Sequence, residues 1–147
     1  MKTLIVEDDF TARLVLQKFL SLYGECHIAV NGREGVDAFR MAMDGGDSYD
    51  LVCMDILLPE MNGEEALREI RALEESRGIL SSAGAKIIMT TAVEDVKDVI
   101  RSFQHLCDAY LIKPIHLSDL LKQLRNFGLV RADMPGMLQR ARAPLAH

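Results

Sequence analysis

The sequence has few of the features that mark secreted, membrane-spanning or nucleic-acid-binding proteins. Its three cysteines, Cys26, Cys53 and Cys107, are scattered, so they indicate neither a disulfide framework nor a zinc site. The apolar runs are short, and none approaches a membrane span or a signal-peptide core. The formal net charge of −5 argues against a basic surface that binds nucleic acid directly. We therefore expect a cytoplasmic chain without membrane insertion.

The apolar residues that are present suffice for one folded domain, since they make up 49% of 147 residues. Short apolar runs alternate along the chain with stretches of helical spacing. The runs are Leu4–Val6, His27–Val30, Leu51–Met54, Ile87–Met89 and Ala109–Ile112. Such nearly continuous apolar runs are typical of strands in a parallel sheet that is buried on both faces.

The stretches between the runs carry apolar residues at the spacing of helices. They begin near Ala12, Val36, Ala66, Val96 and Leu117. Strict alternation of strands and helices predicts an α/β domain with a doubly wound, five-stranded parallel sheet. We place this domain at residues 1–128, because Gly128 suits the end of the last helix. Residues 129–147 are predicted to be a weakly ordered tail or linker stub, and Glu74–Ala85 a long surface loop.

Polar residues follow several of the predicted strands. They are Glu7, Asp8, Asp9, Asp55, Thr90, Thr91 and Lys113. In an open parallel sheet the carboxyl ends of the strands form the usual functional edge. Neighbouring carboxylates repel one another unless a cation lies among them, and oxygen ligands suit Mg²⁺. A lysine and a hydroxyl beside a metal suit a phosphoryl group, which a carboxylate can accept as nucleophile. The pattern therefore predicts a metal-assisted phosphoryl site with Asp55 as acceptor.

Four segments resemble the motifs of the response-regulator receiver domain and occur in the order that this family has. They are Val6–Phe10, Met54–Gly63, Met89–Ala92 and Tyr110–Pro114. Each motif alone is weak, but together they are specific, and the chain is similar to chemotaxis-type single-domain regulators of two-component systems. The resemblance implies a flavodoxin-like (βα)5 fold with strand order 2-1-3-4-5.

The resemblance also implies a role for individual residues of the site. Asp55 would be the phosphorylated aspartate. The implied Mg²⁺ ligands are Glu7, Asp8, Asp55 and the backbone carbonyl of Leu57. The implied phosphoryl-binding and switch residues are Thr91, the backbone of Ala92, Lys113 and Tyr110, with a cis peptide bond before Pro114.

Some neighbouring residues are given other interpretations. Asp9 is taken as a solvated residue that opens the first helix, although it would also suit a third acidic neighbour of the metal. Thr90 is expected to point away from the site, because side chains alternate along a strand. The apolar Leu57 and Val93 beside the site suggest slow hydrolysis of the phosphorylated form.

The resemblance implies a phosphoacceptor signalling domain rather than an enzyme that turns over free substrates. The donor would be a sensor histidine kinase or a histidine phosphotransfer protein. A downstream protein would bind the face formed by the fourth helix, fifth strand and fifth helix, and the chain would act as a monomer or as a phosphorylation-linked homodimer. One alternative is the receiver part of a longer multidomain regulator. Others are a receiver that has lost phosphorylation and a small aspartate-nucleophile phosphatase, whose Asp-x-Asp motif Glu7–Asp9 does not match.

Overall fold

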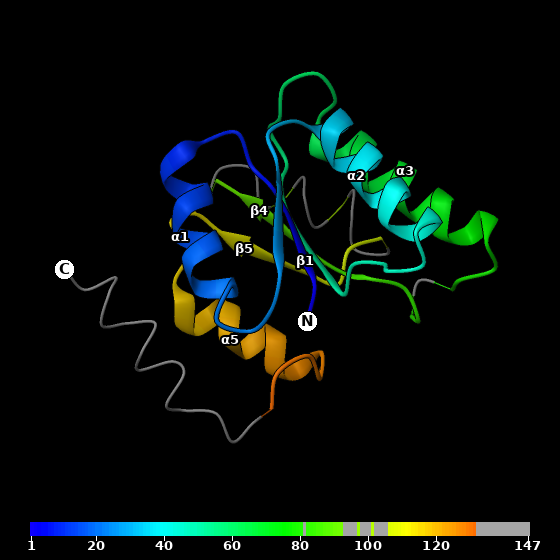
Figure 1. Cartoon of the computed structure of the whole chain (residues 1–147). Helices are drawn as coiled ribbons and strands as arrows, with labels where there is room; N and C mark the ends of the chain where they lie inside the picture. The colour runs from blue at the N-terminus through cyan, green and yellow to red at the C-terminus, as the bar shows by residue number, and fades with distance from the viewer. Residues whose placement is uncertain (81, 93–96, 98–100, 102–105, 132–147) are drawn as a thin grey trace.

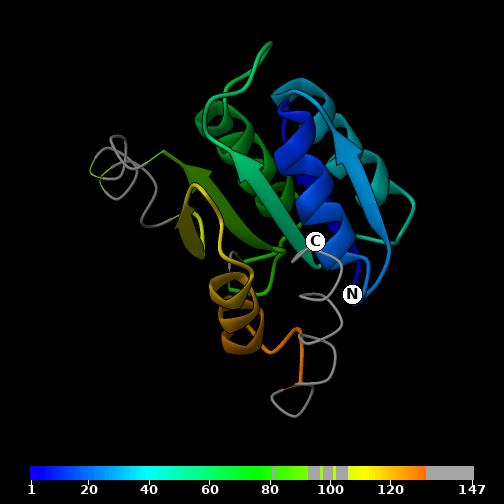
Figure 2. The ribbon, with the colours of Figure 1, turned by 90° about the vertical axis from the view of Figure 1, so that its left-hand side faces the viewer.

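The computed structural model describes residues 1–80, 82–92, 97, 101 and 106–131, and within them lies a parallel sheet in the order β2-β1-β3-β4-β5. The strands are β1 (Thr3–Val6), β2 (Cys26–Ala29), β3 (Leu51–Asp55), β4 (Lys86–Thr91) and β5 (Ala109–Ile112). Every neighbouring pair is parallel. Figure 2 shows β2 at one edge of the sheet and β4 and β5 toward the other. The predicted sheet and strand order are confirmed.

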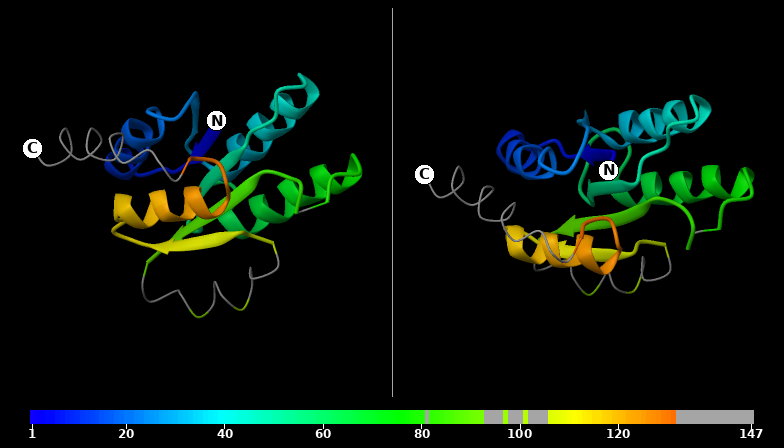
Figure 3. Two further views of the ribbon diagram at one scale, coloured as in Figure 1. Left: turned by 90° about the horizontal axis from the view of Figure 1, so that it is seen from below. Right: turned by 60° about the horizontal axis from the view of Figure 1, so that its bottom comes forward.

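The described helices cover both faces of this sheet. They are α1 (Phe10–Leu20), α2 (Gly32–Asp44), α3 (Gly63–Ser76) and α5 (Leu117–Asn126). One apolar core joins α1 and α5 to the sheet, and a second joins α2 and α3 to it. Figures 1 and 3 show these two pairs on opposite sides of the strands. Most of the helix predicted to begin near Val96 lies outside the described residues, which include Lys97 and Arg101, both helical.

The central strands are buried on both faces, as their apolar runs predict. In β1, Leu4 and Val6 belong to the core beneath α2 and α3, whereas Ile5 belongs to the core beneath α1 and α5. All three side chains are fully buried. A slip of one residue would exchange these two sets of side chains, so the two cores together fix the register in which Glu7 and Asp55 leave the sheet.

Polar caps begin the three helices that follow β1, β2 and β3. The side chains of Asp9, Asn31 and Asn62 accept the backbone N–H groups three residues further on. The Asp9 carboxylate lies 2.8 Å from the Ala12 nitrogen, which confirms its interpretation as the residue that opens the first helix. His116 stands at the same position of α5 but makes no capping hydrogen bond through its side chain.

The opposite end of the sheet holds a buried ion-pair network that the sequence did not reveal. Arg71 of α3 is buried and donates to Glu74 at 2.6 Å, to Asp108 at 2.9 Å and to the carbonyls of Ala85 and Leu106. Glu74 in turn accepts the Ala85 N–H at 2.7 Å. The predicted surface loop Glu74–Ala85 is therefore anchored at both ends, since Glu74 and Ala85 are buried.

The described chain continues beyond α5 into the core. Gly128 has a φ of 74°, the left-handed conformation that commonly ends a helix. Leu129 and Val130 then pack into the core beneath α1 and α5, and Val130 is 7% exposed. The rest of the predicted tail, residues 132–147, lies outside the described residues. Among the helices described, none combines the length and apolar character needed to cross a membrane.

Candidate functional site

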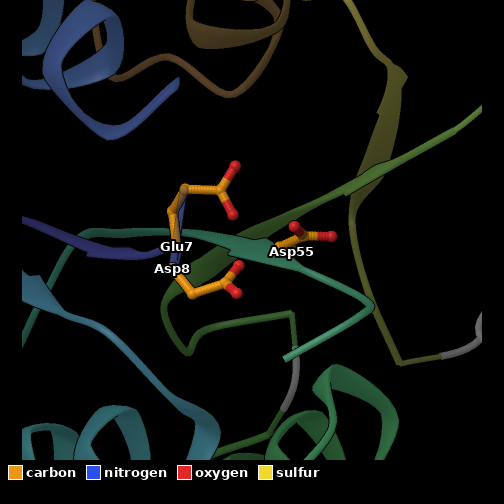
Figure 4. Close-up of side chains that lie close together, drawn as sticks. All are labelled: Glu7, Asp8 and Asp55. Atoms are coloured by element: carbon orange, nitrogen blue, oxygen red, sulfur yellow. The ribbon is translucent and has the colours of Figure 1, made fainter. Parts of the chain in front are cut away.

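Three carboxylates meet where β1 and β3 end. Glu7 and Asp8 directly follow β1, and Asp55 is the last residue of β3, its neighbour in the sheet. One carboxylate oxygen of each residue lies within 4.8 Å of the other two. Glu7 and Asp55 are buried at 1% and 8% exposure, whereas Asp8 is exposed. Figure 4 shows the three side chains gathered at this edge.

Lys113 supplies the positive charge that these carboxylates need. It follows β5, and its Nζ lies 2.6 Å from Glu7 Oε1 and 2.7 Å from Asp55 Oδ2. Its backbone N–H donates to the Thr91 carbonyl at 2.7 Å, which fixes the start of the loop. The Lys113–Pro114 peptide bond is cis, the form that the family resemblance implied. The family resemblance implied that Lys113 lies at the phosphoryl site with Asp55, but nothing in the sequence indicated its contact with Glu7.

The cluster shifts the pKa values of its members. Burial and the neighbouring Asp55 raise the pKa of Glu7 from its usual 4.5 to about 7, although Lys113 opposes this shift. Burial alone would lower the pKa of Lys113, but its hydrogen bonds and charge interactions with Asp55 and Glu7 outweigh burial and leave it raised. Within the described part of the chain, the buried Oε2 of Glu7 has no hydrogen-bond partner. The site therefore has an excess of negative charge and an unused ligand atom.

This pKa gives a prediction for the metal-free protein. A group whose folded-state pKa is raised contributes stability below its unfolded pKa of about 4.5 and loses that contribution as pH rises through about 7. Glu7→Gln removes this titration. As pH rises from 4.5 to 8, the free energy of unfolding of the variant should therefore increase by about 2–3 kcal/mol relative to that of the native chain. Urea unfolding of both chains in EDTA measures this difference. Parallel stability curves across that range would contradict the raised pKa.

The remaining groups of the site come from the loop after β3 and from α1. Asp55 Oδ1 accepts the Leu57 N–H at 3.1 Å, so its two oxygens have different partners. Arg13 of α1 was missed in the sequence. Its guanidinium donates to the carbonyls of Glu7 at 3.1 Å and Asp8 at 3.4 Å, and so holds the acidic backbone in place. Its only sequence signal is a position one helical turn after the acidic motif.

The two threonines of β4 lie at its carboxyl end, beside the end of β3. Thr90 is the register partner of Asp55, and its carbonyl accepts the Ile56 N–H at 3.1 Å. Partners in a parallel sheet share a face, so the expectation that Thr90 points away from the site is not supported. Thr91 is buried, and its hydroxyl donates to the Ala92 carbonyl at 3.1 Å. Tyr110 of β5 is 37% exposed.

The donor set at this edge fits a small hard cation. Its ligand atoms are carboxylate oxygens, which Mg²⁺ prefers. The exposed Asp8 leaves one side open to water, and Mg²⁺ usually keeps several water ligands. The buried Oε2 of Glu7, which has no hydrogen-bond partner among the described residues, is a further ligand atom available to a cation. The residues present thus fit a Mg²⁺ ion beside Asp55.

Comparison with known proteins gives a consistent match. Residues 3–125 match the family model described as the response regulator receiver domain. The transcriptional regulatory protein CusR of Escherichia coli is 32% identical over 127 residues, which are 86% of this chain and 50% of CusR. The chain spans about half the length of the transcriptional regulators that it matches.

Solved structures also resemble the fold, and two of them bear on the site. The first is the co-crystal structure of the Saccharomyces cerevisiae phosphotransfer protein Ypd1 with the receiver domain of Ssk1, with a TM-score of 0.74 and 30% identity over 91% of this chain and 92% of that one. The second is the receiver domain of the Pseudomonas aeruginosa sensor histidine kinase PA1611, which has a magnesium ion in its active-site cleft. Its TM-score is 0.68, with 27% identity over 86% of this chain and 95% of that one.

Proposed function

The chain belongs to the response regulator receiver domain family, and we propose that it accepts a phosphoryl group on Asp55 with the help of Mg²⁺. The observation that carries this proposal is the contact of Asp55 with Lys113 at 2.7 Å inside a cluster of three carboxylates. A buried carboxylate so placed is a restrained nucleophile with a cation beside it. The structural neighbour with magnesium in its cleft supports the choice of metal.

The reaction is an exchange of one bond to phosphorus for another. An Asp55 oxygen attacks the phosphorus of a phosphohistidine in line, the bond from phosphorus to the histidine nitrogen breaks, and the imidazole leaves with the electron pair. Lys113, already 2.7 Å from Asp55 Oδ2, stabilises the charge on the phosphoryl oxygens. A bound Mg²⁺, held by Glu7, Asp8, Asp55 and the Leu57 carbonyl, would neutralise the same oxygens.

The phosphorylated form is proposed to be long-lived. Leu57, two residues beyond Asp55, is 68% exposed and offers no group that could orient an attacking water. Val93, the other apolar neighbour named from the sequence, lies outside the described residues. Self-phosphorylation from small acyl phosphates and slow self-hydrolysis are therefore the only turnovers that we expect from this site.

The partner that donates the phosphoryl group is proposed to dock on α1. Phe10 and Leu14 expose 66% and 38% of their surface on this helix, beside the acidic cluster. A groove lined by Ala12 and Val15 of α1 and by Pro114 opens along another face of the same helix. An apolar surface next to the acceptor suits a helical phosphotransfer protein. Ssk1, whose receiver resembles this fold, was crystallised with the phosphotransfer protein Ypd1.

The response to phosphorylation is proposed to pass through Thr91 and Lys113 to Tyr110. New charge on Asp55 would draw the hydroxyl of Thr91 and the backbone of Ala92 toward the phosphoryl oxygens, and Tyr110 would turn inward. Of the face expected to bind the downstream protein, β5 and α5 are described, whereas most of the fourth helix lies outside the described residues. Tyr110 and Ile112 are exposed on β5, at the edge of the sheet.

A receiver unit within a longer regulator is the second candidate. It is favoured by the match to transcriptional regulators, of which this chain spans about half the length. It is also favoured by matches to hybrid histidine kinases, among them hybrid signal transduction histidine kinase B of Dictyostelium discoideum, of which this chain covers 6%. The phosphoryl chemistry is the same in both candidates, and only the output differs. We also propose that the chain is cytoplasmic and that it acts as a monomer or as a phosphorylation-linked homodimer. Its downstream partner is proposed to be a protein.

Incubation with acetyl phosphate, followed by intact mass spectrometry, tests the proposed acceptor. The native chain should gain one phosphoryl group with Mg²⁺ and none with EDTA. Asp55→Asn should gain none under either condition, because the amide is not a nucleophile of this kind. Addition to the Asp55→Asn chain would refute Asp55 as acceptor, and rapid turnover of many acetyl phosphate molecules per chain would point to a phosphatase instead.

A further inference from the structure

Gly32 is buried against the loop that leaves the candidate site, although it lies outside the acidic, threonine and lysine motifs. It is the first residue of α2, and its backbone approaches that of Met61. A Cβ added at Gly32 would lie 1.9 Å from the Met61 carbonyl oxygen and 2.7 Å from its carbonyl carbon. Both are backbone atoms, so no side-chain rotation would relieve the contact. Any larger residue at position 32 must therefore displace the loop or the helix.

The loop that Gly32 touches is held tightly along its length. It connects Asp55 to α3, and the Gly63 N–H closes it on the Ile56 carbonyl at 2.8 Å. Inside it, the Met61 N–H donates to the Pro59 carbonyl at 2.8 Å across Glu60, whose φ is 68°. This three-residue turn is rare and strained for a residue other than glycine. The loop therefore has little conformational freedom to absorb a displacement of Met61, which would be passed on to Leu57.

The far side of the loop is blocked as well. The side chain of Met61 is 5% exposed and belongs to the core beneath α2 and α3. A Cβ at Gly63 would lie 2.3 Å from the Asp55 carbonyl oxygen, so this end also packs backbone against backbone. The loop is thus confined between the start of α2, the end of β3 and the core.

We infer that Gly32 is a positioning residue for the metal and phosphoryl site, and that it acts through Met61 on the backbone carbonyl of Leu57. The inference rests on the proposed function, because the Leu57 carbonyl matters only if a cation binds beside Asp55. Carbonyl ligands depend on their supporting contacts, and loss of such support typically weakens metal binding by about 10–100-fold. Gly32 would then be required for Mg²⁺ affinity without touching the metal.

The test compares Gly32→Ala with Gly84→Ala. Gly84 is a crowded glycine at the opposite end of the sheet, where a Cβ would lie 2.1 Å from the Glu74 carboxylate, which is the end of a side chain and not backbone. Isothermal titration with Mg²⁺, at a temperature where circular dichroism shows each chain folded, gives the Kd. Gly32→Ala should raise the Kd by about tenfold or more, and Gly84→Ala by less than about twofold. The rate of phosphorylation by acetyl phosphate should recover in Gly32→Ala as Mg²⁺ is raised.

A second pair of variants covers the case in which Gly32→Ala does not fold. Met61→Ala removes the side chain that seats the loop, and Met43→Ala removes a similarly buried methionine of α2 from the same core. Only Met61→Ala should weaken Mg²⁺ binding. A folded Gly32→Ala or Met61→Ala chain with the native Kd would overturn the inference and leave the proposed function intact. If the native chain itself binds no Mg²⁺, both fall together.

Discussion

Replacement of Glu74 by alanine is expected to lower the free energy of unfolding by about 3–5 kcal/mol. Glu74 is 2% exposed and receives the Arg71 guanidinium at 2.6 Å on one oxygen and the Ala85 N–H at 2.7 Å on the other. The substitution leaves a buried guanidinium with less negative charge around it and a buried N–H without an acceptor. Both are among the few changes that destabilise proteins this strongly.

Urea unfolding at low temperature, followed by circular dichroism, measures this loss. Glu75→Ala is the matched control, because it removes the same charge one residue further along α3 from an exposed side chain. The control should change stability by less than about 0.5 kcal/mol. A loss below about 1 kcal/mol for Glu74→Ala would mean that the buried network does not anchor α3 to the start of β4 and β5.

Asp8→Asn is expected to raise the Kd for Mg²⁺ by about 100-fold and to slow phosphorylation by acetyl phosphate to a similar extent at low Mg²⁺. Asp8 is the exposed member of the three carboxylates, so the substitution removes one charge from the cluster without disturbing the core. Folding stability should stay within about 0.5 kcal/mol of the native chain. If Asp8→Asn binds Mg²⁺ weakly but remains as stable as the native chain, Asp8 acts as a metal ligand and not as a residue that stabilises the fold.

Asp9→Asn is the control for Asp8→Asn. It makes the same change of charge at the next residue, and asparagine can cap α1 as well as aspartate does. We expect Mg²⁺ affinity to fall by no more than about threefold, from the loss of a nearby charge alone. Equal losses in the two variants would show that general negative charge, and not ligation by Asp8, attracts the metal.

The fold was predictable because its signals are local or occur in a fixed order. The apolar runs around Ile5 and Met54 indicate buried strands, and parallel strands bring their carboxyl ends to one edge. This rule alone placed Asp8, Asp55 and Lys113 together before any contact was known. The capping role of Asp9 was also visible, since its side chain bonds only three residues away.

The features that escaped prediction depend on contacts between distant segments. The bond of Lys113 to Glu7 and the Arg71–Asp108 pair each join residues whose separation in sequence carries no pattern. The close approach of Gly32 to Met61 belongs to the same class, because a glycine at a helix start is common for several reasons. Such contacts depend on how the helices and loops pack against the sheet, which the periodicity of apolar residues does not specify.

The central claim is that Asp55, and no neighbouring carboxylate, receives the phosphoryl group. Borohydride reduces an aspartyl phosphate to homoserine, so treatment of the chain after incubation with acetyl phosphate and Mg²⁺ marks the acceptor, and peptide mass spectrometry locates it. We predict homoserine at position 55 alone, and none when EDTA replaces Mg²⁺. Homoserine at position 8 or 9, with Asp55 unchanged, would contradict the account.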